Sequence, residues 1–125
     1  MSERRILTHF TNAEGLNGIT GLDPESLIVG EGVIIRVITF GVGQHTQFAR
    51  NDGDIFITEL GPDASSGQLV MIGVSDDKQQ FAIRFDAEDA FNSGVMIYAG
   101  REERSIFVIP ANSVITGEIQ VVKRF

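Results

Sequence analysis

The sequence predicts a single α+β domain in which antiparallel β-strands predominate. Its 125 residues are enough for one hydrophobic core and too few for two ordinary domains, so we expect one domain over residues 1–125. Short segments rich in β-branched and aromatic residues recur along the chain, whereas the clearest helical pattern lies near the N-terminus. These features predict a series of strands, one short N-terminal helix and one or two further helical turns.

The first strand and the first helix follow each other directly. Residues 4–10 (RRILTHF) have a charged start and an apolar centre, which predicts a strand. In residues 11–19 (TNAEGLNGI), Thr11 and Glu14 have the spacing of a capping box, in which a hydroxyl and a carboxylate satisfy free backbone donors. Gly21 predicts the end of this helix, with a proline shortly after it.

Most of the remaining chain is predicted to form strands. Residues 32–43 (GVIIRVITFGVG) are rich in β-branched residues and predict a buried strand. Residues 80–86 (QFAIRFD) alternate between large apolar and other side chains, as in a strand with one face in the core. Further strands are predicted at 53–60, 94–100, 105–111 and 117–125. Residues 65–74 fit either a strand or a short helix, and residues 87–93 fit one helical turn.

Composition limits the classes of function. The formal net charge is −7, from 17 acidic and 10 basic residues, and the cations are scattered. Because proteins that bind nucleic acid normally present a basic face to the phosphates, this charge argues against a nucleic-acid partner. The chain has no cysteine, which excludes disulfides, thiolate metal sites and a cysteine nucleophile. Neither His9 nor His45 is grouped with carboxylates as a metal site requires, so no metal is expected.

No segment of the sequence predicts membrane insertion or secretion. The longest apolar run, residues 32–43, is interrupted by Arg36 and is too short to span a bilayer. The N-terminal residues MSERRIL contain two arginines but no long apolar region, so no signal peptide is predicted. These features favour a cytoplasmic location without membrane contact.

Four segments form a pattern that extends over most of the chain: THFTNAEGLNGI (8–19), NDGDIFITELGPD (51–63), FAIRFD (81–86) and SIFVIPANSV (105–114). Together they resemble the ADP-ribosyltransferase-like toxin domains whose signature residues are histidine, tyrosine and aspartate. Members of that family typically have a His-Tyr-Thr strand end, a short helix with Glu-Gly and Gly-Ile, and a later Gly-x-Tyr-hydrophobic-Thr-Asp-Leu-x-Pro strand. The segment TGEIQVV (116–122) is similar to the glutamate-headed strand of the wider superfamily.

The resemblance assigns expected positions to individual residues. His9 matches the signature histidine, and Glu59 stands where the family has aspartate. Phe10 and Phe56 stand where the family has tyrosine and the strand aromatic, and phenylalanine lacks the tyrosine hydroxyl. Glu118 lies at the head of the late strand.

The resemblance also implies split antiparallel β-sheets around a cleft that uses NAD as a substrate. Cleavage of the nicotinamide–ribose bond produces an oxocarbenium-like sugar, and a fixed carboxylate beside the ribose stabilises its positive charge. Glu118 or Glu59 would supply this catalytic carboxylate. The expected activity is transfer of ADP-ribose to a protein, to another macromolecular acceptor or to water.

Five residues would hold NAD according to the same resemblance. His9 would orient the cofactor by hydrogen bonding, with Phe10 and Thr11 beside it. Phe56 or Tyr98 would stack on the flat pyridinium ring. Toxin domains of this kind are often delivered to a target cell as parts of larger secreted effectors, and an immunity protein neutralises them.

Each candidate residue also has a structural interpretation. His9 can hydrogen-bond to backbone at a strand end, and Phe56 can pack in the core. Glu118 and Glu59 can be carboxylates that face solvent, and Tyr98 can be half-buried scaffold.

Two other classes of function remain open from the residues alone. The acidic charge, the lack of cysteine and the many short strands equally fit a non-catalytic binding or assembly module, such as an immunity protein or a phage structural protein. A ribonuclease toxin would use His9 and His45 as general base and acid. The discriminating feature is whether His9, an aromatic ring and one of the two predicted carboxylates converge on one cleft.

Overall fold

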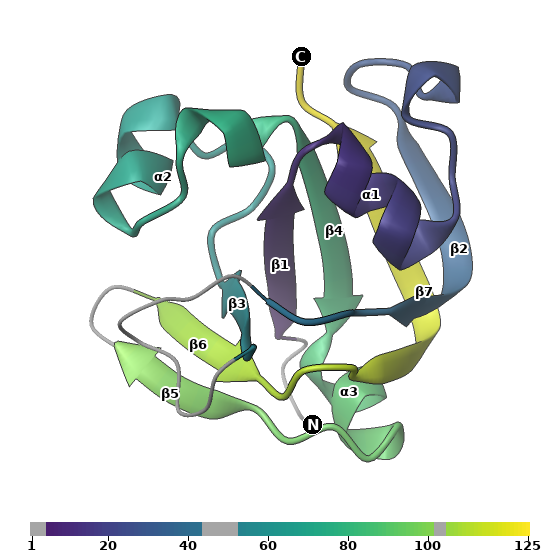
Figure 1. Ribbon diagram of the computed structural model, residues 1–125, viewed down its shortest axis with the longest axis vertical. Coiled ribbons are helices and arrows are strands. Elements are labelled where there is room, and N and C mark those ends of the chain that lie inside the picture. Colours follow the sequence, from purple (N-terminus) through teal and green to yellow (C-terminus); the bar gives the residue numbers. More distant parts are fainter. Residues whose placement is uncertain (1–4, 44–52, 102–104) are drawn as a thin grey trace.

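The computed structural model of the chain describes residues 5–43, 53–101 and 105–125 (Figure 1). The strands are β1 (Ile6–Thr11), β2 (Gly32–Thr39), β3 (Ile55–Thr58), β4 (Phe81–Asp86), β5 (Tyr98–Arg101), β6 (Ile106–Ile109) and β7 (Val114–Lys123). The helices are α1 (Ala13–Thr20), α2 (Ser66–Met71), α3 (Ala87–Asn92) and the short 3-10 helices η1 (Pro24–Ser26) and η2 (Asp76–Gln79). The predicted α+β class with antiparallel strands is confirmed.

The strands pair in the order β2-β7-β4-β1-β3-β6-β5, and each of these pairings is antiparallel. The junction between β1 and β3 is narrow, because Thr8 and Thr58 are its single registered pair. The strands β2, β7, β4 and β1 form the larger part of the sheet. The smaller part contains β3, β6 and β5, and its strands β5 and β6 run across the direction of β1 and β4 (Figure 1). The strands therefore belong to one hydrogen-bonded sheet whose two parts meet at a narrow junction.

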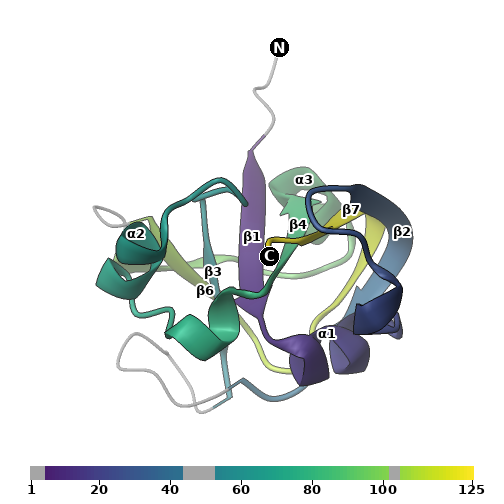
Figure 2. The ribbon, with the colours of Figure 1, turned by 90° about the horizontal axis from the view of Figure 1, so that it is seen from above.

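Both faces of the sheet carry buried apolar side chains. The larger core includes Leu16 of α1 and Ala90 of α3, and the smaller core brings Phe10 of β1 together with Leu69 of α2. Neighbouring strand residues point to opposite faces, and consecutive residues of β4 belong to different cores, so the two cores lie on opposite faces of the sheet. Figure 2 shows β1 in the middle of the fold, with α2 on one side and α1 and β2 on the other.

Helix α1 starts in a different way from the predicted capping box. Its N-cap is Asn12, whose Oδ1 accepts a hydrogen bond from the Gly15 N–H at 2.9 Å. Thr11 is still part of β1, where it pairs with Phe81, so the Thr11–Glu14 box does not form. Asparagine is a strong N-cap residue in its own right, which explains the shift by one position. The predicted end of the helix at Gly21 is confirmed by its left-handed backbone, with φ 76°.

The strand predicted within 32–43 is confirmed as β2, but β2 lies at the edge of the sheet, and the expectation that it is buried is wrong. It pairs with β7 alone, and the side chains of Ile34 and Val37 are 49% and 50% exposed. The pairing is irregular between Ile35 and Val37, and only after this irregularity does a β2 residue, Ile38, become fully buried. A high content of β-branched residues indicates that a segment forms a strand, but it does not indicate where in the sheet the strand lies.

Two short helices cover the ambiguous segments. Residues 65–74 contain α2, whose capping box joins Ser65 and Gln68 reciprocally. Residues 87–93 contain α3, as predicted, and the Asp86 side chain caps its first turn. Among the residues that the structure describes, no helix is long and apolar enough to cross a membrane.

Candidate functional site

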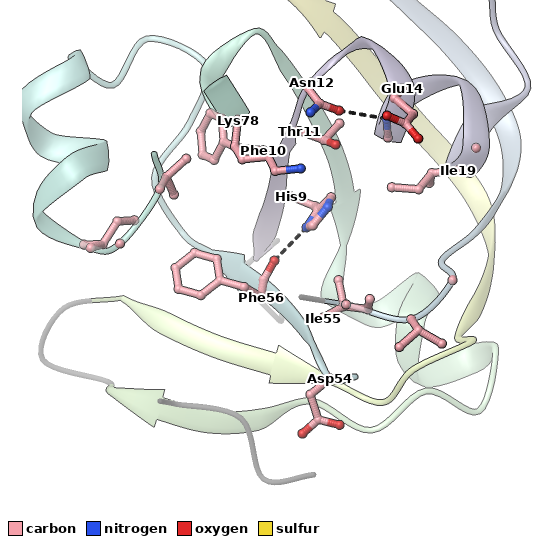
Figure 3. A pocket seen from close by; sticks show the side chains of 18 residues that line it. His9, Phe10, Thr11, Asn12, Glu14, Ile19, Asp54, Ile55, Phe56 and Lys78 are labelled. Atoms are coloured by element: carbon pink, nitrogen blue, oxygen red, sulfur yellow. Dashed lines mark hydrogen bonds between the residues drawn. The ribbon is translucent and has the colours of Figure 1, made fainter. Parts of the chain in front are cut away.

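A cavity of about 540 Å³ opens where β1 leads into α1 (Figure 3), and we call it the His9 cavity. Its wall comes from five separate segments, which are residues 9–12 with the adjoining turns of α1, residues 41–43 after β2, residues 54–56 at the start of β3, residues 72–74, and Lys78 of η2. A concave site assembled from segments that are distant in sequence is typical of ligand-binding sites.

His9 is held in one orientation in the wall of this cavity. Its Nδ1 lies 2.8 Å from the backbone oxygen of Phe56, and because a carbonyl can only accept, Nδ1 donates the proton. The ring also meets the edge of the Phe40 ring, with 5.2 Å between centroids and an angle of 82° between the planes. In the neutral form the other nitrogen, Nε2, therefore carries a free lone pair.

The surroundings of His9 keep the ring uncharged at neutral pH. Burial lowers the pKa of His9 below its ordinary value of 6.5, and this is the largest effect. The hydrogen bond to Phe56 acts in the opposite direction, while the positive charge of Lys78 lowers the pKa further. His9 Nε2 is therefore a hydrogen-bond acceptor, suited to a hydroxyl or amide N–H of a ligand.

Three other predicted binding residues also line the His9 cavity. Phe56 lines the cavity, and Figure 3 shows its backbone oxygen towards His9 and its ring on the side away from His9, where it packs against the smaller core. Phe10 and Thr11 are each only 4% exposed, and Phe10 lies beneath the guanidinium of Arg124, 5.5 Å from its ring centroid. A side chain at Gly15 would collide with Thr11 Oγ1, so any larger residue there would force Thr11 or the start of α1 to shift.

The two predicted catalytic carboxylates lie outside the His9 cavity. Glu59 Oε2 is 3.4 Å from Arg5 Nε, and both side chains are well exposed. Glu118 of β7 lines a second hollow of about 300 Å³, formed by side chains of β1, β2, β4 and β7. Its neighbour Ile119 belongs to the larger core, so Glu118 points to the opposite face of the sheet. His9 contacts that same larger core through Phe40, and the two side chains therefore face away from each other.

The carboxylates that do line the His9 cavity are Glu14 of α1 and Asp54, which directly precedes β3. Asp54 is 3% exposed, whereas Glu14 is exposed at the rim. Tyr98 is partly buried at the start of β5, where it pairs with Val108, and it does not line the cavity. His45 lies outside the described residues.

The structure thus brings together part of the predicted site. Four of the predicted residues line the cavity: His9, Phe10, Thr11 and Phe56. His9 and Phe56 line the same cavity, but the Phe56 ring packs against the smaller core while His9 contacts the larger core, and Glu118 and Glu59 do not line the cavity.

Sequence reasoning missed two charged residues of the cavity, Lys78 and Asp54. Asp54 lies at the start of the strand predicted at 53–60, where the resemblance gives it no role, and Lys78 lies in the charged segment DDKQ, which matches no motif. The one signal available in the sequence was the rarity of lysine, because Lys78 and Lys123 are the only lysines in the chain. Lys78 comes close to His9 because η2 leads directly into β4, and β4 pairs with β1, the strand that carries His9.

No protein-family model, no curated protein and no solved structure matches this chain. Within residues 5–43, 53–101 and 105–125, no three histidine, cysteine, aspartate or glutamate side chains are grouped so that they could hold a metal ion. The function of the chain is therefore inferred from the chemistry of the site.

Proposed function

We propose that this chain binds NAD in the His9 cavity and cleaves its nicotinamide–ribose bond, transferring ADP-ribose to a macromolecular acceptor or to water. The observation that carries the proposal is the neutral His9, whose Nε2 can accept a hydrogen bond in a cavity that Phe56 also lines. The resemblance of residues 8–19 and 51–63 to ADP-ribosyltransferase-like toxin domains supports the same function. The narrow β1–β3 junction supports a split-sheet fold of that type.

The donors of the nicotinamide riboside half of NAD complement His9. The ribose hydroxyls and the carboxamide NH₂ can each donate to the Nε2 lone pair, whereas a pure acceptor cannot. Phe56 offers an aromatic face for the cationic pyridinium ring. These contacts fix the position of the bond that breaks, and nicotinamide leaves as a neutral molecule without needing a proton.

The carboxylate that stabilises the oxocarbenium-like sugar is assigned to the cavity wall in this proposal. Asp54 and Glu14 line the His9 cavity, whereas Glu118 and Glu59 lie elsewhere. A negative charge must be close to the developing positive charge in order to stabilise it, and this requirement favours the first pair.

Nicotinamide release from NAD by the purified chain, with and without cell extract, tests the proposal. We expect release by the wild type and a rate about 100-fold lower in His9→Ala, because NAD loses the contact that orients it. Glu25→Gln, on the exposed helix η1, is the matched control and retains the wild-type rate. If the wild type releases no nicotinamide under either condition, the proposed activity is wrong.

The same assay assigns the carboxylate. Asp54→Asn or Glu14→Gln is expected to lower the rate by about 100-fold or more, because transition-state charge is left uncompensated. A loss confined to Glu118→Gln or Glu59→Gln would instead assign the role to the carboxylates outside the cavity.

A non-catalytic binding or assembly module is the second candidate. It is favoured by the separation of Glu118 and Glu59 from His9, and by exposed apolar residues on and before the edge strand β2, namely Ile28, Val29, Ile34 and Val37. A toxin effector would instead act on a macromolecule in a target cell and be bound by an immunity protein. NAD bound without nicotinamide release would favour the binding module.

A further inference from the structure

Lys78 is a cation in the wall of the His9 cavity. Among the described residues, its amino group has neither an ion-pair partner nor a hydrogen-bond partner. Figure 3 shows this amino group turned into the cavity beside His9. The charge also acts on His9, because it lowers the pKa of that ring.

The two aspartates next to Lys78 in the sequence are engaged elsewhere. Asp77 Oδ2 accepts a hydrogen bond from Asn12 Nδ2 at 2.9 Å, which ties η2 to the start of α1. Asp76 Oδ1 lies 3.4 Å from Ser66 Oγ and 3.5 Å from Gln79 Nε2. The fold therefore directs these carboxylates away from Lys78 and leaves its charge for an anion in the cavity.

Lys78 and Asp54 lie at different ends of the His9 cavity. Figure 3 shows Asp54 at the far end of the cavity from Lys78, with His9 and Phe56 between them. Glu14 lies on α1 at the rim. NAD has the same distribution, because its pyridinium ring is cationic and its diphosphate is anionic. A ligand with this distribution can place its phosphates towards Lys78.

We propose that Lys78 binds the phosphates of the nucleotide in the His9 cavity, so that the site selects phosphate-bearing ligands over free nucleosides. Lysine acts as a compact point charge for phosphate, and a partly enclosed charge is screened less by salt than a surface one. The identity of the nucleotide as NAD rests on the proposed function, whereas the phosphate contact rests on Lys78 itself.

Calorimetric titration of the full chain with NAD, ADP-ribose and nicotinamide riboside, at one ionic strength, tests this inference. The variants are Lys78→Met and Lys123→Met, and Lys123 is the matched control because it is the other lysine and lies outside the cavity. We expect Lys78→Met to weaken NAD and ADP-ribose binding about tenfold or more, the usual effect of losing a charged hydrogen bond, and to leave nicotinamide riboside unchanged. Lys123→Met is expected to bind all three ligands like the wild type.

The outcomes separate the inference from the proposed function. If Lys78→Met binds NAD and ADP-ribose as the wild type does, or weakens all three ligands equally, Lys78 is not a phosphate residue, even if NAD is cleaved. If ADP-ribose binds through Lys78 while NAD is neither bound nor cleaved, the phosphate site stands and the proposed function fails. If the wild type binds none of the three ligands, both are overturned.

Discussion

At the scale of single residues, His9 owes its chemical role to its neighbours. The Phe56 carbonyl occupies Nδ1, the edge of Phe40 supports the ring, and Lys78 disfavours a second proton. Together with burial, these contacts leave a neutral imidazole with one free acceptor. The same contacts make the protonation of His9 unfavourable in the folded state, so the stability of the fold depends on pH.

Stability is expected to fall as the pH is lowered from 7 through the pKa of unfolded His9, which is ordinarily 6.5. The folded chain takes up this proton only at lower pH. Between the pKa values of unfolded and folded His9 the unfolded state binds more protons, so lowering the pH stabilises the unfolded state relative to the folded state. Denaturant unfolding between pH 7 and pH 5 measures the effect. His9→Gln is the control, because it removes the titration but leaves Glu14, Asp54 and Lys78 around the site. An equal pH dependence in the wild type and His9→Gln would contradict the role given to His9.

At the scale of elements, the junction of β1 and α1 builds the cavity. Asn12 ends the strand and caps the helix, and it also bonds to Asp77 of η2. Gly15 lets the first turn of α1 lie against Thr11. The edge strand β2 is a contrasting element, because Arg36 and the irregularity beside it interrupt a row of exposed apolar side chains. Such features protect sheet edges from pairing with other chains.

Two glycines of α1 are expected to respond oppositely to alanine. Gly15→Ala forces a Cβ onto Thr11 Oγ1 and is expected to lower the free energy of unfolding by about 1–3 kcal/mol. Gly18 has no atom within 4 Å of the added Cβ, so Gly18→Ala is expected to stabilise the helix by about 0.5–1 kcal/mol. Denaturant unfolding of both variants checks this pair. A similar change in both would mean that α1 does not pack tightly on β1.

At the scale of the whole molecule, the fold class follows from local patterns, but the site does not. The residue composition of the strands and the pattern of residues after Thr8 are local features of the sequence. They predicted β1 and α1, and they placed His9 near the end of β1. The face on which Glu118 lies depends on the register and packing of β7, which one sequence does not specify. The bond between His9 and Phe56 joins residues 47 positions apart, and the approach of Lys78 likewise depends on tertiary pairing.

NMR titration of the ¹³C-histidine-labelled chain with NAD measures whether NAD binds at His9, as we propose. The chain has two histidines, so the His9 resonance is the one that disappears in His9→Gln. We expect NAD to shift this resonance in a saturable way while the ring stays neutral, because Nε2 accepts a hydrogen bond from the ligand. A His9 resonance that does not move at any NAD concentration would contradict the claim.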